Sequence, residues 1–329
     1  MANQKGVLMV FKSLLLVLFL IPTTVTKPIQ IIATTGMVAD ITREVAGDHA
    51  VVTSLMGEGV DPHLYKPTAA DAKAIVSADM VFYSGLMLEG TMTDTFLKAA
   101  RMGKLVYPVT ELIDESYLLE PPEFQGHWDP HVWMDVSAWS QAVEAIANAL
   151  CEQDEVNCKE YKANAERYKA KLHNLHEYAI TSIASIPKNR RILITAHDAF
   201  NYFGRAYGIE VVGIQGLSTE SEAGIEDVNR LVNILVNNRI TAVFVESSVS
   251  DRNVNALIEG AAAKGHTVKI GGRLFSDAMG QVGTYKGTYI GMLDHNITTI
   301  SAALGGNAPE DGFAMMPQSN QPTGGNDEH

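Results

Sequence analysis

The sequence is poor in cysteine and in positive charge. Its 329 residues include 25 Lys and Arg against 38 Asp and Glu, which gives a formal net charge of −13. A chain this acidic is poorly suited to nucleic acid or to an anionic membrane surface, so neither is expected as a partner. The only two cysteines, Cys151 and Cys158, lack CxxC spacing and have no histidine between them. They predict a local disulfide in an exported protein, with two free thiols as the alternative.

Hydrophobic runs long enough to cross a membrane are also missing. Residues 1–26 carry Lys5 and Lys12, no acidic residue, and an apolar run of residues 14–21 that ends at Pro22. This is the layout of a secretory signal peptide, and the run is too short to span a bilayer. An uncleaved anchor is the alternative, because no clear small-x-small cleavage site precedes residue 27. Residues 20–27 contain no cysteine for lipid attachment. We therefore expect a periplasmic protein without membrane insertion, whose charge becomes −15 when the two leader lysines are removed.

Familiar catalytic motifs are missing as well. There is no Walker loop, no GxGxxG after the first strand-like run and no GxSxG elbow. Nucleotide binding and serine hydrolysis of those kinds are therefore not indicated.

The remaining pattern predicts an α/β fold. Short β-rich runs alternate with helical stretches, which is typical of parallel βα units. The runs are residues 29–35, 51–57, 80–85 and 104–109, followed by 190–197, 209–216, 241–248 and 266–272. Because the two series are separated by a different kind of segment, we expect two α/β lobes, residues 27–154 and 188–304, each with a mainly parallel sheet flanked by helices.

One long amphipathic helix is predicted between the lobes, over residues 155–187. Its apolar positions recur at steps of four and three and stop at Pro187; they are Tyr161, Ala165, Tyr168, Leu172, Leu175, Ala179 and Ile183. A helix of about 30 residues spans roughly 45 Å, enough to act as a rigid strut across both lobes. The tail, residues 305–329, is rich in Gly, Pro, Asn and acid, and we expect it to be disordered.

A repeated motif suggests a metal site. The segments VDPHLY and WDPHVW place His63 and His131 after the same Asp-Pro pair, where proline stiffens the turn. His197 ends a strand in ILITAH, and Asp277 follows the last strand run in LFSDAM. Carboxyl ends of parallel strands meet at one edge of a sheet, which is where such folds bind ligands. We therefore predict that these four residues bind one divalent metal.

Three imidazoles and one carboxylate suit Zn²⁺ and also accept Mn²⁺ or Fe²⁺. Each residue also has a structural alternative, since a strand-end histidine can be a hydrogen-bonded core residue and Asp277 can cap a helix. A zinc hydrolase is the enzymatic alternative, but four protein ligands leave no open position for water, which favours binding over catalysis. Asp61, Asp129 and Glu246 either orient the imidazoles or only cap turns. His127, near the second of these motifs, could also lie at the rim but is left out of the site.

At these residues the chain resembles the TroA/ZnuA-like metal-specific solute-binding proteins of ABC importers. The resemblance runs from about residue 27 to 305 and rests on GVDPHLYKPTAAD, DPHVWMDV, ITAHDAFNYF, FVESS and LFSDAMG, in that order. It implies two pseudo-symmetric lobes joined by a rigid helix, with metal held in the cleft by His63, His131, His197 and Asp277. It also implies a monomer that meets an ABC permease of the inner membrane transiently, with no enzymatic activity.

Two departures bear on the metal. Residues 65–86 contain no histidine, whereas many zinc-dedicated members carry a His-rich loop there. His197 stands where some manganese-dedicated members have Glu. The resemblance therefore leaves Zn²⁺, Mn²⁺ and Fe²⁺ open.

Overall fold

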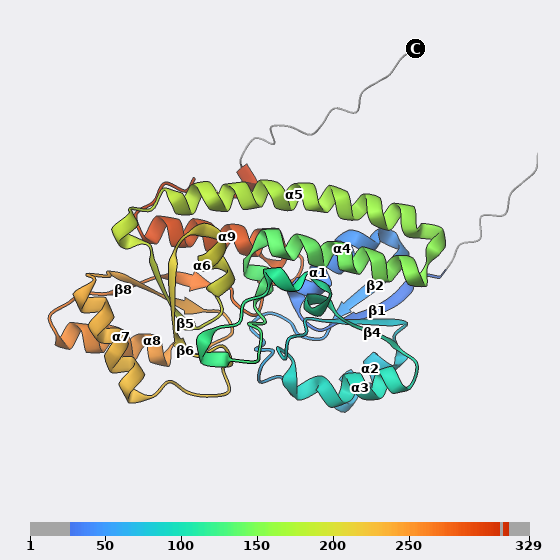
Figure 1. The fold of residues 1–329 in the computed structure, drawn as a ribbon, viewed down its shortest axis with the longest axis horizontal. Coiled ribbons are helices and arrows are strands. Elements are labelled where there is room, and N and C mark those ends of the chain that lie inside the picture. Colours follow the sequence, from blue (N-terminus) through green and yellow to red (C-terminus); the bar gives the residue numbers. More distant parts are fainter. Residues whose placement is uncertain (1–26, 310–311, 316–329) are drawn as a thin grey trace, which may run out of the picture.

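The first lobe contains a parallel four-stranded sheet, as predicted. The computed structural model describes residues 27–309 and 312–315, and Figure 1 shows them as two α/β lobes beneath one long helix. The sheet order is β2-β1-β3-β4, with β1 (Ile29–Ala33), β2 (Ala50–Ser54), β3 (Met80–Tyr83) and β4 (Leu105–Pro108). Helices α1 (Gly36–Ala46) and α4 (Val136–Gln153) cover one face, while α2 (Ala69–Ser77) and α3 (Thr93–Arg101) cover the other.

The second lobe repeats this plan. Strand β5 (Ile192–His197) pairs in parallel with β6 (Glu210–Gln215), and β7 (Ala242–Glu246) pairs in parallel with β8 (Lys269–Leu274). The strands are hydrogen-bonded as two separate two-stranded sheets and not as the single sheet expected, but β5 also lies against β7, so the spatial order β6-β5-β7-β8 corresponds to that of the first lobe. Helices α7 (Ile225–Asn237) and α8 (Arg252–Ala263) cover one face, and α6 (Asn201–Tyr207) and α9 (Tyr289–Ala303) pack on the other. Residues that follow the carboxyl ends of strands in both lobes come together between the lobes, at His63, His131, His197 and Asp277.

A single helix, α5 (Cys158–Ala184), joins the lobes (Figure 1). Its 27 residues correspond to a length of about 40 Å. It packs on α1 and α4 of the first lobe and on α9 of the second. Tyr168, Leu172 and Leu175 are buried in one hydrophobic cluster that continues through both lobes. The lobes are therefore fastened together by a shared core and not by the helix backbone alone.

One buried carboxylate bridges the lobes inside this core. Asp40 of α1 accepts a hydrogen bond from the amide of Tyr289, at the start of α9, over 2.9 Å. It also accepts one from the hydroxyl of Tyr168 on α5, over 3.3 Å. Burial raises the pKa of Asp40 to about 6, and Glu44 adds to the rise, although both hydrogen bonds oppose it. The ionisable group therefore sits where α1, α5 and α9 meet.

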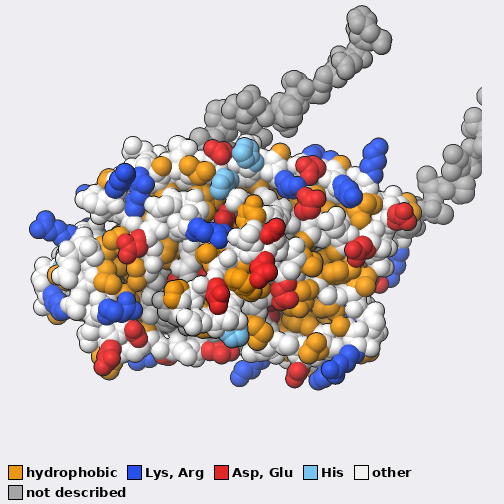
Figure 2. Space-filling model, in the orientation of Figure 1, with side chains coloured by type: hydrophobic (Ala, Val, Ile, Leu, Met, Phe, Trp, Pro, Cys, Tyr) orange, Lys and Arg blue, Asp and Glu red, His pale blue; other side chains and the backbone are white. Residues whose placement is uncertain are grey.

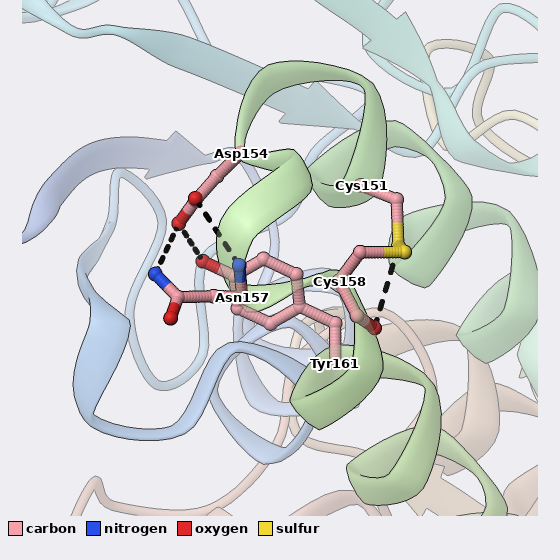
Figure 3. Close-up of a disulfide and its surroundings, with 5 residues drawn as sticks. All are labelled: Cys151, Asp154, Asn157, Cys158 and Tyr161. Carbon is pink, nitrogen blue, oxygen red and sulfur yellow. Dashed lines mark hydrogen bonds between the residues drawn. A yellow bond between two sulfur atoms is a disulfide. The ribbon is translucent and has the colours of Figure 1, made fainter.

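The predicted disulfide between Cys151 and Cys158 is confirmed, and Figure 3 shows its surroundings. It links the last turn of α4 to the first residue of α5. Beside it, Asp154 accepts hydrogen bonds from the side-chain amide of Asn157 and from the hydroxyl of Tyr161, both over 2.7 Å. The corner from which the long helix starts is thus closed by a covalent bond and by polar contacts.

The predicted signal peptide, residues 1–26, lies outside the described residues. Among the residues that are described, no helix has both the length and the apolar character needed to cross a membrane. In the tail, Phe313–Met315 form a 3-10 turn whose first amide donates to Asp294 of α9 over 2.7 Å. This turn is packed, which differs from the disorder expected for the whole of residues 305–329. On the face shown in Figure 2, acidic side chains are interspersed with basic ones and no continuous basic patch is visible.

Candidate metal centre

The two Asp-Pro-His segments form the same local turn. The amide of His63 donates to Asp61 Oδ1 over 2.9 Å, and the amide of His131 donates to Asp129 Oδ1 over the same distance. Proline between the two residues restricts the backbone, and the aspartate side chain closes the turn. Each histidine therefore projects from a stiff turn into the cleft, which explains why the motif occurs twice.

The second lobe supplies its two residues from strand ends. His197 is the last residue of β5, and Asp277 follows β8 by three residues. The segment of Asp277 is held in place because the indole of Trp133, in the first lobe, donates to the carbonyl of Ser276 over 2.9 Å.

All four predicted residues converge on one point. Their ligand atoms lie within 4.8 Å of one another, and all four residues are buried. The Nε2 atoms of His63 and His131 are 3.4 Å apart. The carboxylate of Asp277 lies 3.1 Å from His197 Nε2, 3.4 Å from His131 Nε2 and 3.7 Å from His63 Nε2. The spacing is that of a tight cluster around one ion-sized position.

Three atoms of the cluster are buried polar atoms without a hydrogen-bond partner among the described residues: His197 Nε2, Asp277 Oδ1 and Asp277 Oδ2. Buried polar groups in folded proteins are normally satisfied, and leaving one unsatisfied costs about 1–3 kcal/mol. The unmet acceptors all face the same point. A cation there would satisfy them together, so the donor set fits a metal.

The orientation of two imidazoles is set by carboxylates behind them. Asp129 Oδ1 contacts His131 Nδ1 at 2.7 Å, and Glu246 Oε2 contacts His197 Nδ1 at 2.5 Å. Each Nδ1 can donate its proton to the carboxylate, which leaves the Nε2 lone pair directed into the cleft. Asp129 and Glu246 therefore orient imidazoles, whereas Asp61 caps its turn with one oxygen and accepts a hydrogen bond from Thr219 with the other. The sequence left open whether these aspartates orient an imidazole or cap a turn: Asp129 orients the imidazole of His131, and Asp61 caps the turn of His63.

The electrostatics of the cluster depend on these carboxylates. Burial lowers the pKa of His131, but the nearby carboxylates of Asp129 and Asp277 outweigh it and raise that pKa to about 9. Burial likewise opposes the charged form of His197, yet Asp277 and Glu246 raise its pKa well above the usual range. Burial dominates at His63 and lowers its pKa to about 3. The pKa of Asp277 is raised by burial but lowered further by His197 and His131, ending well below its usual range.

A pocket of about 330 Å³ opens beside the cluster. Of the four residues, only His63 lines it, together with Leu86, Met87 and Trp128. His127 is exposed on the wall of the same pocket and does not belong to the four-residue cluster. His63 is therefore the residue of the cluster that faces this pocket.

Comparison with known proteins agrees with the motifs. Residues 31–303 match the family model described as zinc-uptake complex component A, periplasmic. The chain belongs to the ZnuA/TroA family. Within this family it is 48% identical over 278 residues to the manganese-binding lipoprotein MntA of Bacillus subtilis, a match covering 84% of this chain and 90% of the relative. It is 45% identical over 278 residues to the zinc-binding protein TroA of Treponema pallidum, covering 84% and 89%.

Solved structures of ZnuA/TroA proteins share the fold. The periplasmic zinc-binding protein TroA of Treponema pallidum superposes with a TM-score of 0.82 at 44% identity, covering 84% of this chain and 99% of that one. The Mn-bound periplasmic metal-binding protein of Candidatus Liberibacter asiaticus gives a TM-score of 0.74 at 26% identity, covering 84% and 100%. The α/β architecture with a long joining helix is thus confirmed, and ZnuA/TroA proteins are substrate-binding components of ABC transporters. The zinc-hydrolase alternative finds no support.

Proposed function

We propose that this protein captures one divalent transition metal between its lobes and delivers it to an ABC permease. The observation that carries the proposal is the convergence of His63, His131, His197 and Asp277 on one buried point, with unmet acceptor atoms directed at it. Three neutral imidazoles and a carboxylate bring the charge of a bound divalent ion to a formal +1, which lowers the cost of burying it.

Binding is the whole of the proposed activity, with no bond made or broken. The first lobe contributes two histidines and the second contributes a histidine and an aspartate, so a bound ion links the lobes. Four protein ligands leave no open coordination position for a reactive water, which favours a receptor over an enzyme. The core shared through α5 favours small local movements over a wide hinge opening.

The proposed location is the periplasm, where the protein would act as a monomer that meets its permease transiently. The predicted leader of residues 1–26 supports export. The disulfide between Cys151 and Cys158 supports an oxidising compartment. Several relatives are named lipoproteins, whereas both solved structures compared above are named periplasmic, so an anchored and a free form both have to be considered. The lack of a cysteine in residues 20–27 favours the free form here.

The cargo we propose is Mn²⁺ or Zn²⁺, with Fe²⁺ as the third ion to test. MntA is named for manganese and TroA for zinc, and they match this chain at nearly equal identity. Zn²⁺ outbinds Mn²⁺ at most nitrogen-rich sites, so affinity alone does not identify the physiological ion.

Metal analysis of the purified exported chain tests the proposal, followed by competition of the three ions at buffered free concentrations. We expect one tightly bound ion per chain. The His197→Ala variant should lose it, whereas His127→Ala, which removes an exposed histidine beside the same pocket, should retain it. An exported chain that carries no ion, and is stabilised by none of the three, would overturn the proposal.

A further inference from the structure

Three of the four ligands belong to one tightly bonded block. Two hydrogen bonds to Asp129 fix the turn of His131 to the second lobe. Asn201 Nδ2 donates to the side chain of Asp129 over 3.1 Å, and the hydroxyl of Tyr202 donates to its backbone carbonyl over 2.8 Å. The indole of Trp133 adds the contact to Ser276 described above. Of the three ligands in this block, His131 and His197 are fully buried and Asp277 is 2% exposed.

The fourth ligand is held differently. His63 is 5% exposed and has no carboxylate behind its imidazole among the described residues. Its turn reaches the second lobe through one side-chain hydrogen bond, in which the hydroxyl of Thr219 donates to Asp61 Oδ2 over 2.6 Å. The same aspartate caps the His63 amide with its other oxygen. Thr219 is therefore linked to His63 through a single carboxylate.

Thr219 lies in the segment between β6 and α7, and its neighbours Leu217 and Ser218 line the pocket beside His63. On the other wall, Leu86 and Met87 have φ of +51° and +66°, which non-glycine residues rarely adopt. The hydrogen bond from Thr219 to Asp61 thus spans the two lobes next to this pocket. It connects the least buried ligand to the opposite lobe.

We propose that Thr219 is a positioning residue that latches His63 onto the metal, and that metal leaves past His63 through this pocket when the latch opens. The inference rests on the proposed function. It assigns release to one ligand: His63 withdraws with its turn while His131, His197 and Asp277 keep their arrangement. A hydrogen bond to a charged acceptor is worth more than a neutral one, so its loss should have a measurable effect on release.

The test measures metal release by mixing the loaded full chain with a chelating dye in a stopped-flow instrument, with Mn²⁺ and Zn²⁺ used separately. Thr219→Val keeps the side-chain shape and removes the hydroxyl. We expect release about tenfold faster, equivalent to about 1.4 kcal/mol. Thr219→Ser should retain the wild-type rate. Thr241→Val makes the same change at an exposed residue just before β7, away from this pocket, and should leave the rate within twofold. Thermal unfolding of each variant without metal checks that folding is unchanged.

A double variant shows whether Thr219 acts through His63. In a His63→Ala background, which keeps three ligands, Thr219→Val should have no further effect on the release rate. Equal acceleration in both backgrounds would overturn the latch, as would wild-type release from Thr219→Val itself. These outcomes all require a wild-type chain that binds one ion, so they differ from failure of the proposed function, in which the wild type binds none.

Discussion

Replacing Asp40 by Asn should stabilise the protein at neutral pH. Asp40 is 8% exposed, and its pKa is raised from 3.8 to about 6 chiefly by burial. A carboxyl group whose pKa is raised on folding contributes stability below its unfolded pKa, and this contribution is lost as the pH rises through the folded pKa. The difference between the folded and unfolded pKa values corresponds to about 3 kcal/mol in the free energy of unfolding, at roughly 1.4 kcal/mol per pH unit. About 2 kcal/mol of this stability is lost between pH 4.5 and 7.

Asparagine should keep the native contacts without the charge. Both the Tyr289 amide and the Tyr168 hydroxyl donate to the same oxygen of Asp40, and an amide oxygen can accept both hydrogen bonds. The variant should therefore differ little from wild type at pH 4.5 and become more stable than it by about 2 kcal/mol toward pH 7.

The assay is urea unfolding of metal-free wild type and variant at several pH values between 4.5 and 7. Other groups that titrate in this range affect both proteins equally, so the informative quantity is the difference between the two free energies of unfolding. Asp48→Asn is the matched control, because it makes the same change at an exposed carboxylate just after α1, where solvent screens the charge, and its difference from wild type should change little with pH. A difference that stays constant across the range for Asp40→Asn would refute the assigned pKa and the reasoning from burial.

Other predictions concern the metal centre and the disulfide. Asp277→Ala should weaken metal binding by at least about tenfold and leave the circular dichroism spectrum unchanged; unchanged affinity, measured by calorimetry, would remove Asp277 from the site. Glu246→Gln should weaken binding by about 10–100-fold, because it alters the hydrogen bond that orients His197; equal affinity would limit Glu246 to a structural role. The raised pKa values of His131 and His197 mean that metal must displace protons at pH 7, so affinity should increase with pH and calorimetry in buffers of different ionisation enthalpy should detect proton release; a pH-independent affinity between 6 and 8 would contradict this. Replacing both cysteines by serine should lower the free energy of unfolding by about 2.5 kcal/mol, the loop-closure entropy of a short loop; a loss below about 0.5 kcal/mol would show that the α4–α5 corner does not need the bond.

Much of the fold could be predicted because the determining signals are local. Each predicted β-rich run overlaps a strand, and the periodic apolar residues from Tyr161 to Ile183 lie on the buried side of α5. Residues at strand ends must lie at the same edge of a parallel sheet, so the positions of His197 and Asp277 followed from the strand assignments. The proximity of all four site residues is consistent with that reasoning.

What the sequence did not predict depends on contacts between distant segments. The two Asp-Pro-His motifs look alike, yet Asp129 reaches its imidazole while Asp61 turns toward Thr219, because different parts of the second lobe face them. Thr219 follows no periodic pattern and could not be distinguished from other loop hydroxyls. The raised pKa of Asp40 likewise depends on the meeting of three helices from separate parts of the chain.

The hydrophobic core that runs through both lobes also bears on the thermodynamics of metal capture. Two halves that share one core should unfold in a single cooperative transition, visible as one calorimetric peak. Holding His131, His197 and Asp277 at the right spacing costs conformational entropy, and in such a molecule that cost is met during folding, before any ion arrives. At the proposed site, metal would then have to immobilise little more than the turn of His63, which leaves more of the coordination free energy available as affinity.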